Sequence, residues 1–335
     1  MPANKSLRSN LRRVNVLPSL LTLGNFACGF FSIVFCLNTL FFTTRAQMLD
    51  QRDAPPNVSL EAAGNPDQPG IPDPLPTALP PRAKHGFSAT DSTARASYML
   101  HWACAILFVG MLFDMLDGKI ARHMGADSAF GKELDSLADI VTFGVAPPVI
   151  AITLWISVMP ERASWWGQVM IFGVVYAACA ALRLARYNVE EGSDKNLFSG
   201  LPSPAAAGCI VTAVLLVEGS YGFMNSVYEW ISWASFGEIP VVQVKARLLG
   251  VYLLGVGLLM VTTVPFVHLA NRYLTGRKPF SILVIVVLFL ALLWHEPRLI
   301  LFLAFNGYMA VGLIFGFRKA WRVRREKRAR LEERG

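Results

Sequence analysis

Residues 114 to 139 read DMLDGKIARHMGADSAFGKELDSLAD, a stretch rich in carboxylates within a chain that is mostly apolar. Hydrophobic residues make up 54% of the chain and charged residues only 16%, whereas a typical soluble domain carries about 25% charged residues. The composition therefore predicts an integral membrane protein. Several carboxylates buried in such a protein need cations to neutralise them, because an isolated charge is costly in a bilayer.

The spacing of four of these aspartates predicts a metal site. Asp114 and Asp117 are three residues apart and Asp135 and Asp139 four apart, so each pair shares one face of a helix. Carboxylate oxygens favour hard ions such as Mg²⁺ or Mn²⁺ over zinc. Two divalent ions would balance four carboxylates, which indicates a two-metal site that binds a phosphate or pyrophosphate. Helix caps are the alternative, but caps do not require a second acid one turn later on both helices.

Small residues and one arginine accompany the aspartates. Gly118 lies inside a predicted helix, where glycine costs about 1 kcal/mol relative to alanine. This cost suggests that a ligand approaches the bare backbone there, beside the small residues Ala121 and Gly131. Arg122 follows Gly118 by one helical turn, and its guanidinium is suited to binding phosphate oxygens.

The stretch fits the pattern DxxDGxxARx8GxxxDxxxD without a departure and resembles the CDP-alcohol phosphatidyltransferase family. This resemblance implies a membrane enzyme that transfers a phosphatidyl group from CDP-diacylglycerol to an alcohol and releases CMP. It implies metal ligation by all four aspartates and makes Asp139 the catalytic base. The implied nucleotide contacts are Gly118, Arg122 and Ser128, with further candidates at Ser19, Thr22, Ala121 and Gly131.

Four other stretches resemble the bacterial phosphatidylserine synthase branch of that family, whose acceptor is L-serine. They are LPSLLTLGN at 17–25, ELDSLADIVTFGVAPP at 133–148, RLARYNVE at 183–190 and FSGLPSPAAAG at 198–208. Relatives often carry asparagine where this chain has Ser19, so an amide-specific contact is lost at that position. Thr22 remains a candidate on the nucleotide side, with Asn25 a weaker one.

Two arginines at the end of the fourth apolar run are candidates for binding the acceptor. Arg183 and Arg186 are three residues apart, and two guanidinium groups could receive the carboxylate of an amino acid. Snorkelling to lipid phosphates is the alternative for Arg183 and the favoured interpretation for Arg186. Ser203 lies between two prolines with no base beside it in sequence, so we interpret it as a helix-entry cap.

The predicted fold is all-α: a polytopic membrane helix bundle of six core transmembrane helices plus a C-terminal helical hairpin, eight spans in all. A span needs about 20 apolar residues, and the apolar runs cover 16–42, 98–119, 130–156, 165–184, 201–217, 248–269, 280–294 and 299–317. The seventh run is short, so the last two runs could instead form a re-entrant hairpin.

Charge and composition predict the domain organisation. Basic residues at both ends predict cytoplasmic termini and an active site near the cytoplasmic face of the inner membrane. The Pro-rich segment lacks the apolar residues that a packed core needs. The expected regions are a basic head and first span at 1–42, a flexible non-cytoplasmic loop at 43–96, a catalytic core at 97–270, a hairpin at 271–317 and a basic tail at 318–335.

Rival functions come from other classes. An acceptor such as glycerol 3-phosphate or inositol phosphate would keep the aspartate site but need more cationic residues. A transporter also carries intramembrane carboxylates, yet the chain holds no second copy of the aspartate pattern. A catalytically dead scaffold disagrees with the complete aspartate set. The expected partners are CDP-diacylglycerol, L-serine and the lipid bilayer, without nucleic acid; a homodimer is left open.

Overall fold

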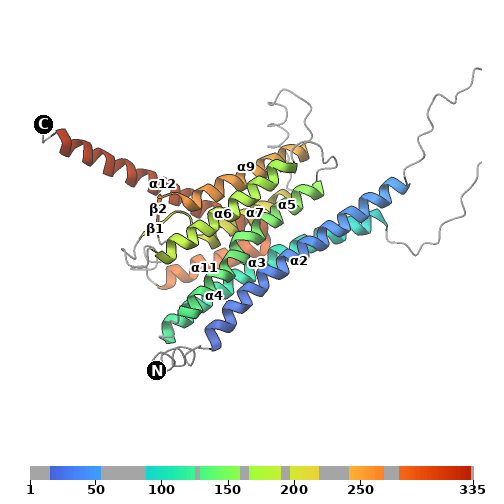
Figure 1. The fold of residues 1–335 in the computed structure, drawn as a ribbon, viewed down its shortest axis with the longest axis horizontal. Helices are drawn as coiled ribbons and strands as arrows, with labels where there is room; N and C mark the ends of the chain where they lie inside the picture. Colours follow the sequence, from blue (N-terminus) through green and yellow to red (C-terminus); the bar gives the residue numbers. More distant parts are fainter. Residues whose placement is uncertain are drawn as a thin grey trace, which may run out of the picture.

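The computed structural model describes residues 16–53, 88–124, 129–158, 166–189, 197–218, 241–267 and 279–332. These residues form a helical bundle with one short strand pair (Figure 1). In chain order the elements are α2 (Val16–Asp53), α3 (Ala89–Met124), α4 (Ala129–Asp139), the π-helix η2 (Ile140–Val145), α5 (Ala146–Val158), α6 (Trp166–Val189), β1 (Leu197–Ser199), α7 (Ser203–Glu218), α9 (Val241–Val261), β2 (Pro265–Val267), α11 (Pro279–His295) and α12 (Pro297–Glu332).

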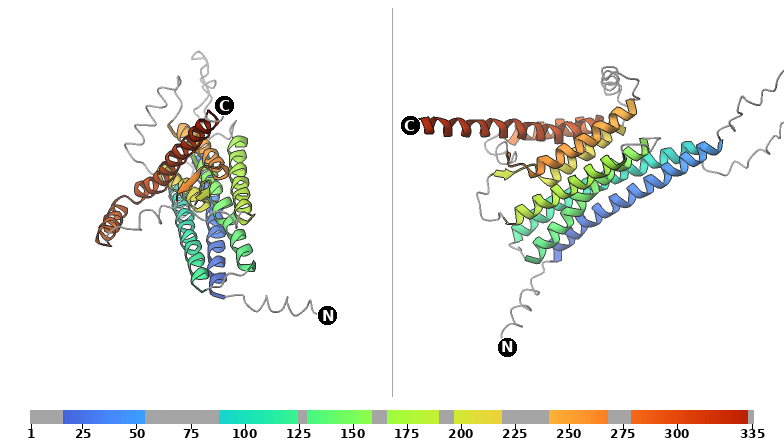
Figure 2. Two further views of the ribbon diagram at one scale, coloured as in Figure 1. Left: turned by 90° about the vertical axis from the view of Figure 1, so that its left-hand side faces the viewer. Right: turned by 45° about the horizontal axis from the view of Figure 1, so that its top comes forward.

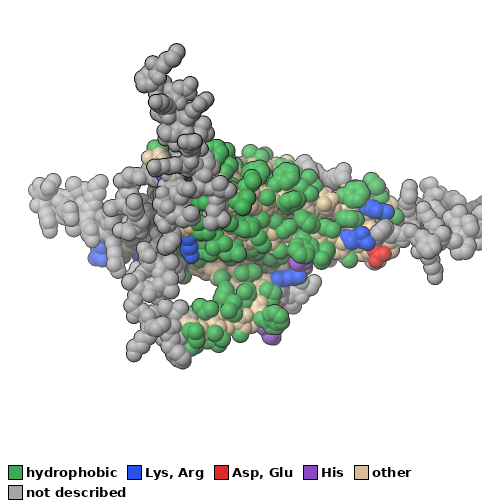
Figure 3. Space-filling model, turned by 90° about the horizontal axis from the view of Figure 1, so that it is seen from below, with side chains coloured by type: hydrophobic (Ala, Val, Ile, Leu, Met, Phe, Trp, Pro, Cys, Tyr) green, Lys and Arg blue, Asp and Glu red, His purple; other side chains and the backbone are tan. Residues whose placement is uncertain are grey.

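The helices are compatible with a membrane. Each of the eight predicted apolar runs overlaps at least one of these helices. Five helical segments are long and apolar enough to cross a bilayer: Pro18–Asp50, Thr90–Ile120, Phe130–Val158, Gly167–Val189 and Pro297–Gly316. The three shorter apolar helices are Ser203–Glu218, Arg247–Val261 and Leu283–His295. The surface in Figure 3 is accordingly apolar along the bundle, with charged side chains gathered mainly toward its ends.

The ends of the predicted loop at 43–96 are helical. Helix α2 continues to Asp53 and α3 already begins at Ala89. The residues from Thr43 to Asp53 contain no proline or glycine, and the first proline follows at Pro55, so nothing in this stretch interrupts the helix. The loop boundaries predicted from hydropathy therefore differ from the helix ends, because polar residues can extend a helix beyond its apolar part. Residues 54–87 lie outside the described part of the chain.

A two-stranded antiparallel pair departs from the all-α prediction. β1 pairs with β2 in the register Leu197 to Val267 and Ser199 to Pro265. Hydropathy predicted a helix over 248–269, but α9 ends at Val261, because Pro265 cannot donate the backbone hydrogen bond that a helix requires. Gly200 follows β1 with φ +86, and its N–H donates to the carbonyl of Val264 at 3.0 Å. The strand pair therefore determines how the chain enters α7.

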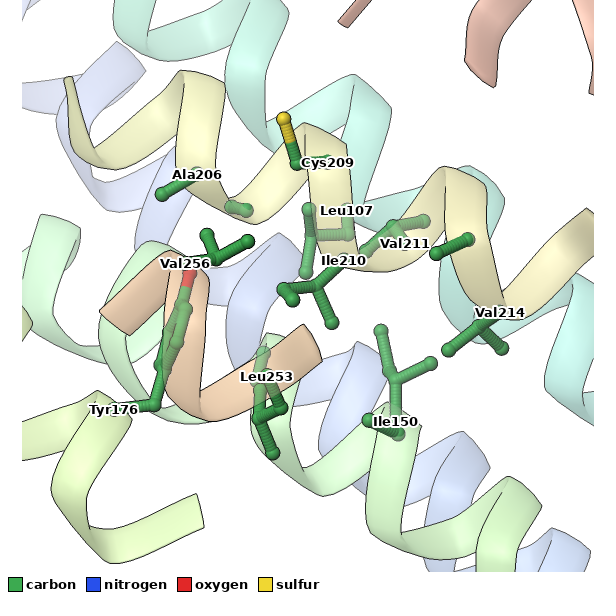
Figure 4. Close-up of a cluster of buried hydrophobic side chains, with 14 of the residues drawn as sticks. Leu107, Ile150, Tyr176, Ala206, Cys209, Ile210, Val211, Val214, Leu253 and Val256 are labelled. Carbon is green, nitrogen blue, oxygen red and sulfur yellow. The ribbon is translucent and has the colours of Figure 1, made fainter. Parts of the chain in front are cut away.

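Side chains from α2, α3, η2, α5, α6, α7 and α9 form one buried core. Figure 4 shows Tyr176 of α6, Ile210 of α7 and Leu253 of α9 in one cluster with side chains from α3 and α5. Tyr176 is completely buried, and its hydroxyl donates to the carbonyl of Phe143 in η2 at 3.3 Å. The core thus supports the π-helix, which directly follows Asp139.

Helix α12 packs against α7 of the bundle, whereas α11 packs mainly against α12 (Figure 2). At Gly208 of α7 an added Cβ would lie 2.1 Å from the ring of Phe305 in α12. At the start of α12, Arg298 donates to His101 Nε2 of α3 at 2.6 Å, and the same nitrogen lies 3.2 Å from Glu218 of α7. The C-terminal helix is therefore part of the packed structure.

Replacing Gly200 with alanine is expected to lower stability. The new Cβ would lie 2.4 Å from the carbonyl oxygen of Met260 at a positive φ, a strain of roughly 1–3 kcal/mol. Gly255→Ala is the matched control, since a Cβ there meets nothing within 4 Å in helix α9. Thermal unfolding in detergent, followed by tryptophan fluorescence, should show a lower midpoint for Gly200→Ala only. Equal unfolding midpoints for Gly200→Ala and Gly255→Ala would contradict the close approach of residue 200 to the carbonyl of Met260.

Candidate active site

Three carboxylates meet where α3 and α4 approach each other. Carboxylate oxygens of Asp114, Asp135 and Asp139 all lie within 4.8 Å of one another. Asp114 lies on α3, whereas Asp135 and Asp139 lie one turn apart on α4, as their spacing predicted. Asp139 is 9% exposed, and Asp114 and Asp135 are half-buried. The two helices therefore present one compact group of oxygen ligands.

Asp117, the fourth predicted ligand, lies beside this group and not within it. Its side chain is 5% exposed, and Thr22 Oγ1 of α2 lies 3.1 Å from Asp117 Oδ2. The same hydroxyl also lies 3.1 Å from the carbonyl oxygen of Pro18, so its one proton is shared between two acceptors. Asp117 is close enough to Asp135 for their charges to interact. The structure thus brings three of the four aspartates together, and it places the fourth, on α3, against Thr22 of α2.

Helix α2 also contacts Asp139. Asn25 is completely buried, and its Nδ2 donates to Asp139 Oδ1 at 3.2 Å. Sequence analysis placed Asn25 only as a weak nucleotide-side candidate and missed this contact. A signal was present, since Thr22 and Asn25 are three residues apart and therefore share the helix face that meets Asp117 and Asp139.

A π-helix follows the last aspartate directly. η2 covers Ile140–Val145, between α4 and α5, and buries Thr142, Phe143 and Gly144. Insertions of this kind are rare and frequently occur at functional sites. The apolar run predicted at 130–156 contains no sign of it, because hydropathy does not distinguish a π-turn from an α-turn.

The group of carboxylates fits a divalent metal ion. Asp135 Oδ1 is buried and has no hydrogen-bond partner among the described residues, although a buried polar atom normally has one. The three ligands all offer oxygen, which Mg²⁺ and Mn²⁺ prefer. A cation at this position would neutralise the carboxylates and satisfy the unpaired oxygen.

The structure describes only some of the predicted nucleotide contacts in full. Gly118 is exposed on α3, and a Cβ there would meet nothing within 4 Å, so space is present beside the carboxylates. Gly131 lies near the start of α4, and Ser19 is half-buried on α2, one turn before Thr22. Ala121 and Arg122 lie near the end of α3, but their side chains fall outside the described part, as does all of Ser128.

The two candidate acceptor arginines both contact protein. Arg183 Nη1 donates to the hydroxyl of Ser203 at 2.8 Å, and Arg183 Nε is buried without a hydrogen-bond partner among the described residues. The charge of Asp139 acts on this guanidinium, which places it near the carboxylates. Arg186 Nη1 instead donates to the carbonyl of Val261 at the end of α9, at 3.2 Å. Ser203 is the first residue of α7, so its helix-entry position is as predicted, but its contact with Arg183 was missed.

Comparison with known proteins agrees with the geometry. The family model described as CDP-alcohol phosphatidyltransferase matches residues 89–238. A protein of Bacillus subtilis (strain 168) named CDP-diacylglycerol–serine O-phosphatidyltransferase is 34% identical over 143 residues, 41% of this chain and 77% of that protein. A protein of the same name from Helicobacter pylori (strain ATCC 700392 / 26695) is 32% identical over 223 residues, 65% of this chain and 81% of that protein.

An archaeal relative has a related name. The archaetidylserine synthase of Methanothermobacter thermautotrophicus is 36% identical over 135 residues, 40% of this chain and 54% of that protein. The matched residues 89–238 include α3, α4, η2 and the whole carboxylate group. With its membrane-compatible helices and its cluster of aspartates, the chain belongs to the CDP-alcohol phosphatidyltransferase family, a family of phosphotransferase enzymes.

Proposed function

We propose that the chain transfers the phosphatidyl group of CDP-diacylglycerol to L-serine, giving phosphatidylserine and CMP. The observation that carries the proposal is the convergence of Asp114, Asp135 and Asp139, with oxygens within 4.8 Å of one another. It is supported by the names of the bacterial relatives, which are serine O-phosphatidyltransferases.

We propose that the four aspartates hold two divalent ions, Mg²⁺ or Mn²⁺. Asp114, Asp135 and Asp139 form the central ligand group, and Asp117 lies beside it on α3. Bound there, such ions neutralise the pyrophosphate and the charge that develops during phosphoryl transfer. The nucleotide would lie over the open space at Gly118, with Ser19, Thr22, Ala121, Arg122, Ser128 and Gly131 as its proposed contacts.

Asp139 is the proposed general base. One of its oxygens accepts from Asn25, which leaves the other to take the proton from the serine hydroxyl. The serine oxygen then forms a bond to the phosphorus that carries the diacylglycerol group. The bond from this phosphorus to the bridging oxygen breaks, and CMP leaves with the electron pair.

Arg183 is the proposed ligand of the serine carboxylate. Ser203 holds one end of its guanidinium, and the buried Nε has no partner among the described residues. A charge-assisted bond to a carboxylate is stronger than one between neutral groups. The Coulombic interaction between Arg183 and Asp139 supports a serine whose carboxylate binds Arg183 while its hydroxyl faces Asp139. Arg186 has a backbone partner and is the weaker of the two candidates.

The proposed topology has eight spans with both termini in the cytoplasm and the site at the cytoplasmic side of the inner membrane. The five long and three shorter apolar helices support this number, although α11, at 17 residues, would be only about 25 Å long. The basic residues of 1–42 and 318–335 support cytoplasmic ends. In the corresponding division, 43–96 is an outer segment whose ends belong to helices α2 and α3, 97–270 is the catalytic core and 271–317 is the hairpin.

The acceptor and the metal requirement can be measured together. Purified protein in liposomes with labelled CDP-diacylglycerol should release CMP when serine and Mg²⁺ or Mn²⁺ are present, and no CMP after chelation with EDTA. Glycerol 3-phosphate and inositol phosphate should give no product, since Arg183 supplies one guanidinium and not the further cations that a phosphate needs. If turnover with glycerol 3-phosphate or inositol phosphate equals that with serine, serine is not the specific acceptor. Full activity in EDTA would reject the metal site.

Asp139→Asn is expected to remove turnover while nucleotide binding remains measurable. The amide cannot accept the proton of serine, and loss of a general base lowers rates by roughly 10²–10⁴-fold. CMP binding by calorimetry should persist, because the other aspartates remain in place. An Asn variant that works at nearly the full rate would rule out the assignment of the base.

Arg183→Ala is expected to raise KM for serine by about 10- to 100-fold, the cost of losing a charge-assisted hydrogen bond of about 1.5–3 kcal/mol. KM for CDP-diacylglycerol should stay within about twofold, since this substrate is proposed to bind elsewhere. Arg186→Ala serves as the matched control on the same helix, because its guanidinium binds a backbone carbonyl. Similar serine KM values for the two variants would refute the specific role of Arg183.

A further inference from the structure

Asn25 joins two parts of the site that are far apart in sequence. Its side-chain amide donates to Asp139 Oδ1 at 3.2 Å, and its own backbone carbonyl accepts a hydrogen bond from Thr142 Oγ1 at 2.9 Å. Asp139 ends α4, and Thr142 lies within η2. One residue of α2 therefore binds both the carboxylate and the π-helix that follows it.

Close packing holds this arrangement in place. At Gly29, one turn after Asn25, an added Cβ would lie 2.5 Å from Thr142 Oγ1 and 2.7 Å from its Cα. At Gly110 of α3, a Cβ would lie 3.0 Å from Thr142 Cγ2 and 3.3 Å from Asn25 Oδ1. Only glycine lets α2 approach η2 this closely. Asn25 therefore has little freedom to turn away from Asp139.

The chemistry of the amide matches the task of orienting a carboxylate. A side-chain NH₂ group donates hydrogen bonds and accepts none, so it keeps Asp139 Oδ1 engaged as an acceptor. This leaves the other oxygen of Asp139 for the remaining partners of the site. A fixed carboxylate reaches its substrate without the loss of rate that accompanies a misplaced group.

Packing alone does not require an amide at position 25. Asn25 is completely buried, yet its Oδ1 has no hydrogen-bond partner among the described residues. An unsatisfied buried acceptor costs about 1–3 kcal/mol. The unsatisfied oxygen offsets part of the gain from the bond that the amide donates to Asp139, so stability alone gives little reason for an asparagine at this position.

We propose that Asn25 is a positioning residue for Asp139, and that Thr142 in the π-helix fixes Asn25 in turn. This proposal rests on the role of Asp139 as the base. Asn25 touches no reacting atom; it acts through the orientation of one carboxylate.

The test compares Asn25→Leu with wild type. Leucine has nearly the same shape as asparagine. It removes the unsatisfied oxygen, which favours the folded state, but also the donor to the buried Asp139, which disfavours it, so the thermal midpoint should change little and serves as the control for folding. kcat should fall by roughly 10- to 100-fold, the usual effect of losing a partner that orients a ligand, while KM for both substrates stays within about threefold. Mn²⁺ affinity, measured by electron paramagnetic resonance without substrate, should fall about 10-fold. A kcat within about twofold of wild type would overturn the proposal.

A second pair of variants keeps the test decisive if Asn25→Leu does not fold. Thr142→Val removes only the hydroxyl that binds Asn25 and should lower kcat about fivefold, equivalent to one hydrogen bond of about 1 kcal/mol. Thr39→Val is the matched control: Thr39 is buried in α2, the helix that carries Asn25, and its hydroxyl donates to the carbonyl of Phe35 one turn earlier. Equal kcat for Thr142→Val and Thr39→Val would reject the role of Thr142.

Combining Asn25→Leu with Asp139→Asn separates failure of this proposal from failure of the proposed base. Residues that act as a unit are strongly non-additive, so the double variant should be no slower than Asp139→Asn alone. A further loss in the double variant means that Asn25 acts elsewhere. If Asp139→Asn itself keeps its activity, the assigned base is wrong.

Discussion

The structure depends on carboxylates that must be kept together against their mutual repulsion, in a protein whose surface is mostly apolar. Carboxylate oxygens of Asp114, Asp135 and Asp139 lie within 4.8 Å of one another. Burial of such charges is unfavourable without neutralising partners. Two features meet this requirement. Oxygen ligands converge where a divalent cation fits, and α2 supplies a donor to Asp117 and another to Asp139.

Helix α2 is therefore more than a first membrane span. It packs chiefly against α3 along its length, and Thr22 and Asn25 reach the carboxylates of two other helices. The glycines at 29 and 110 allow the backbones of α2, α3 and η2 to come close. The π-helix then carries Thr142 against α2 directly after Asp139. Packing and chemistry are thus joined at a single crossing of three helical segments.

The strand pair and α7 determine the position of Arg183, whose charge interacts with that of Asp139. Gly200 turns the chain at a positive φ, and Ser203 begins α7 with its hydroxyl against Arg183. Arg186 ties the end of α6 to the end of α9. Helix α12, which lies outside the matched residues 89–238, packs against α7 at Gly208 and Phe305. The C-terminal hairpin thus supports the helix that bears Ser203.

The sequence by itself determined the helical class, the apolar runs and the aspartates that form the centre of the site. These features are local: hydropathy identifies spans, and a spacing of three or four residues places side chains on one helix face. Even so, polar residues extended α2 to Asp53, and Pro265 ended a predicted helix early.

Only the tertiary structure decided which partners meet those aspartates. Asn25 and Asp139 are 114 positions apart, and Thr22 and Asp117 are 95 apart. Such contacts depend on the relative rotation and depth of packed helices, and no local pattern encodes these. The same reason applies to the π-helix at 140–145, to the antiparallel strand pair and to Ser203 beside Arg183. Each arises because side chains distant in sequence fill one close-packed interior.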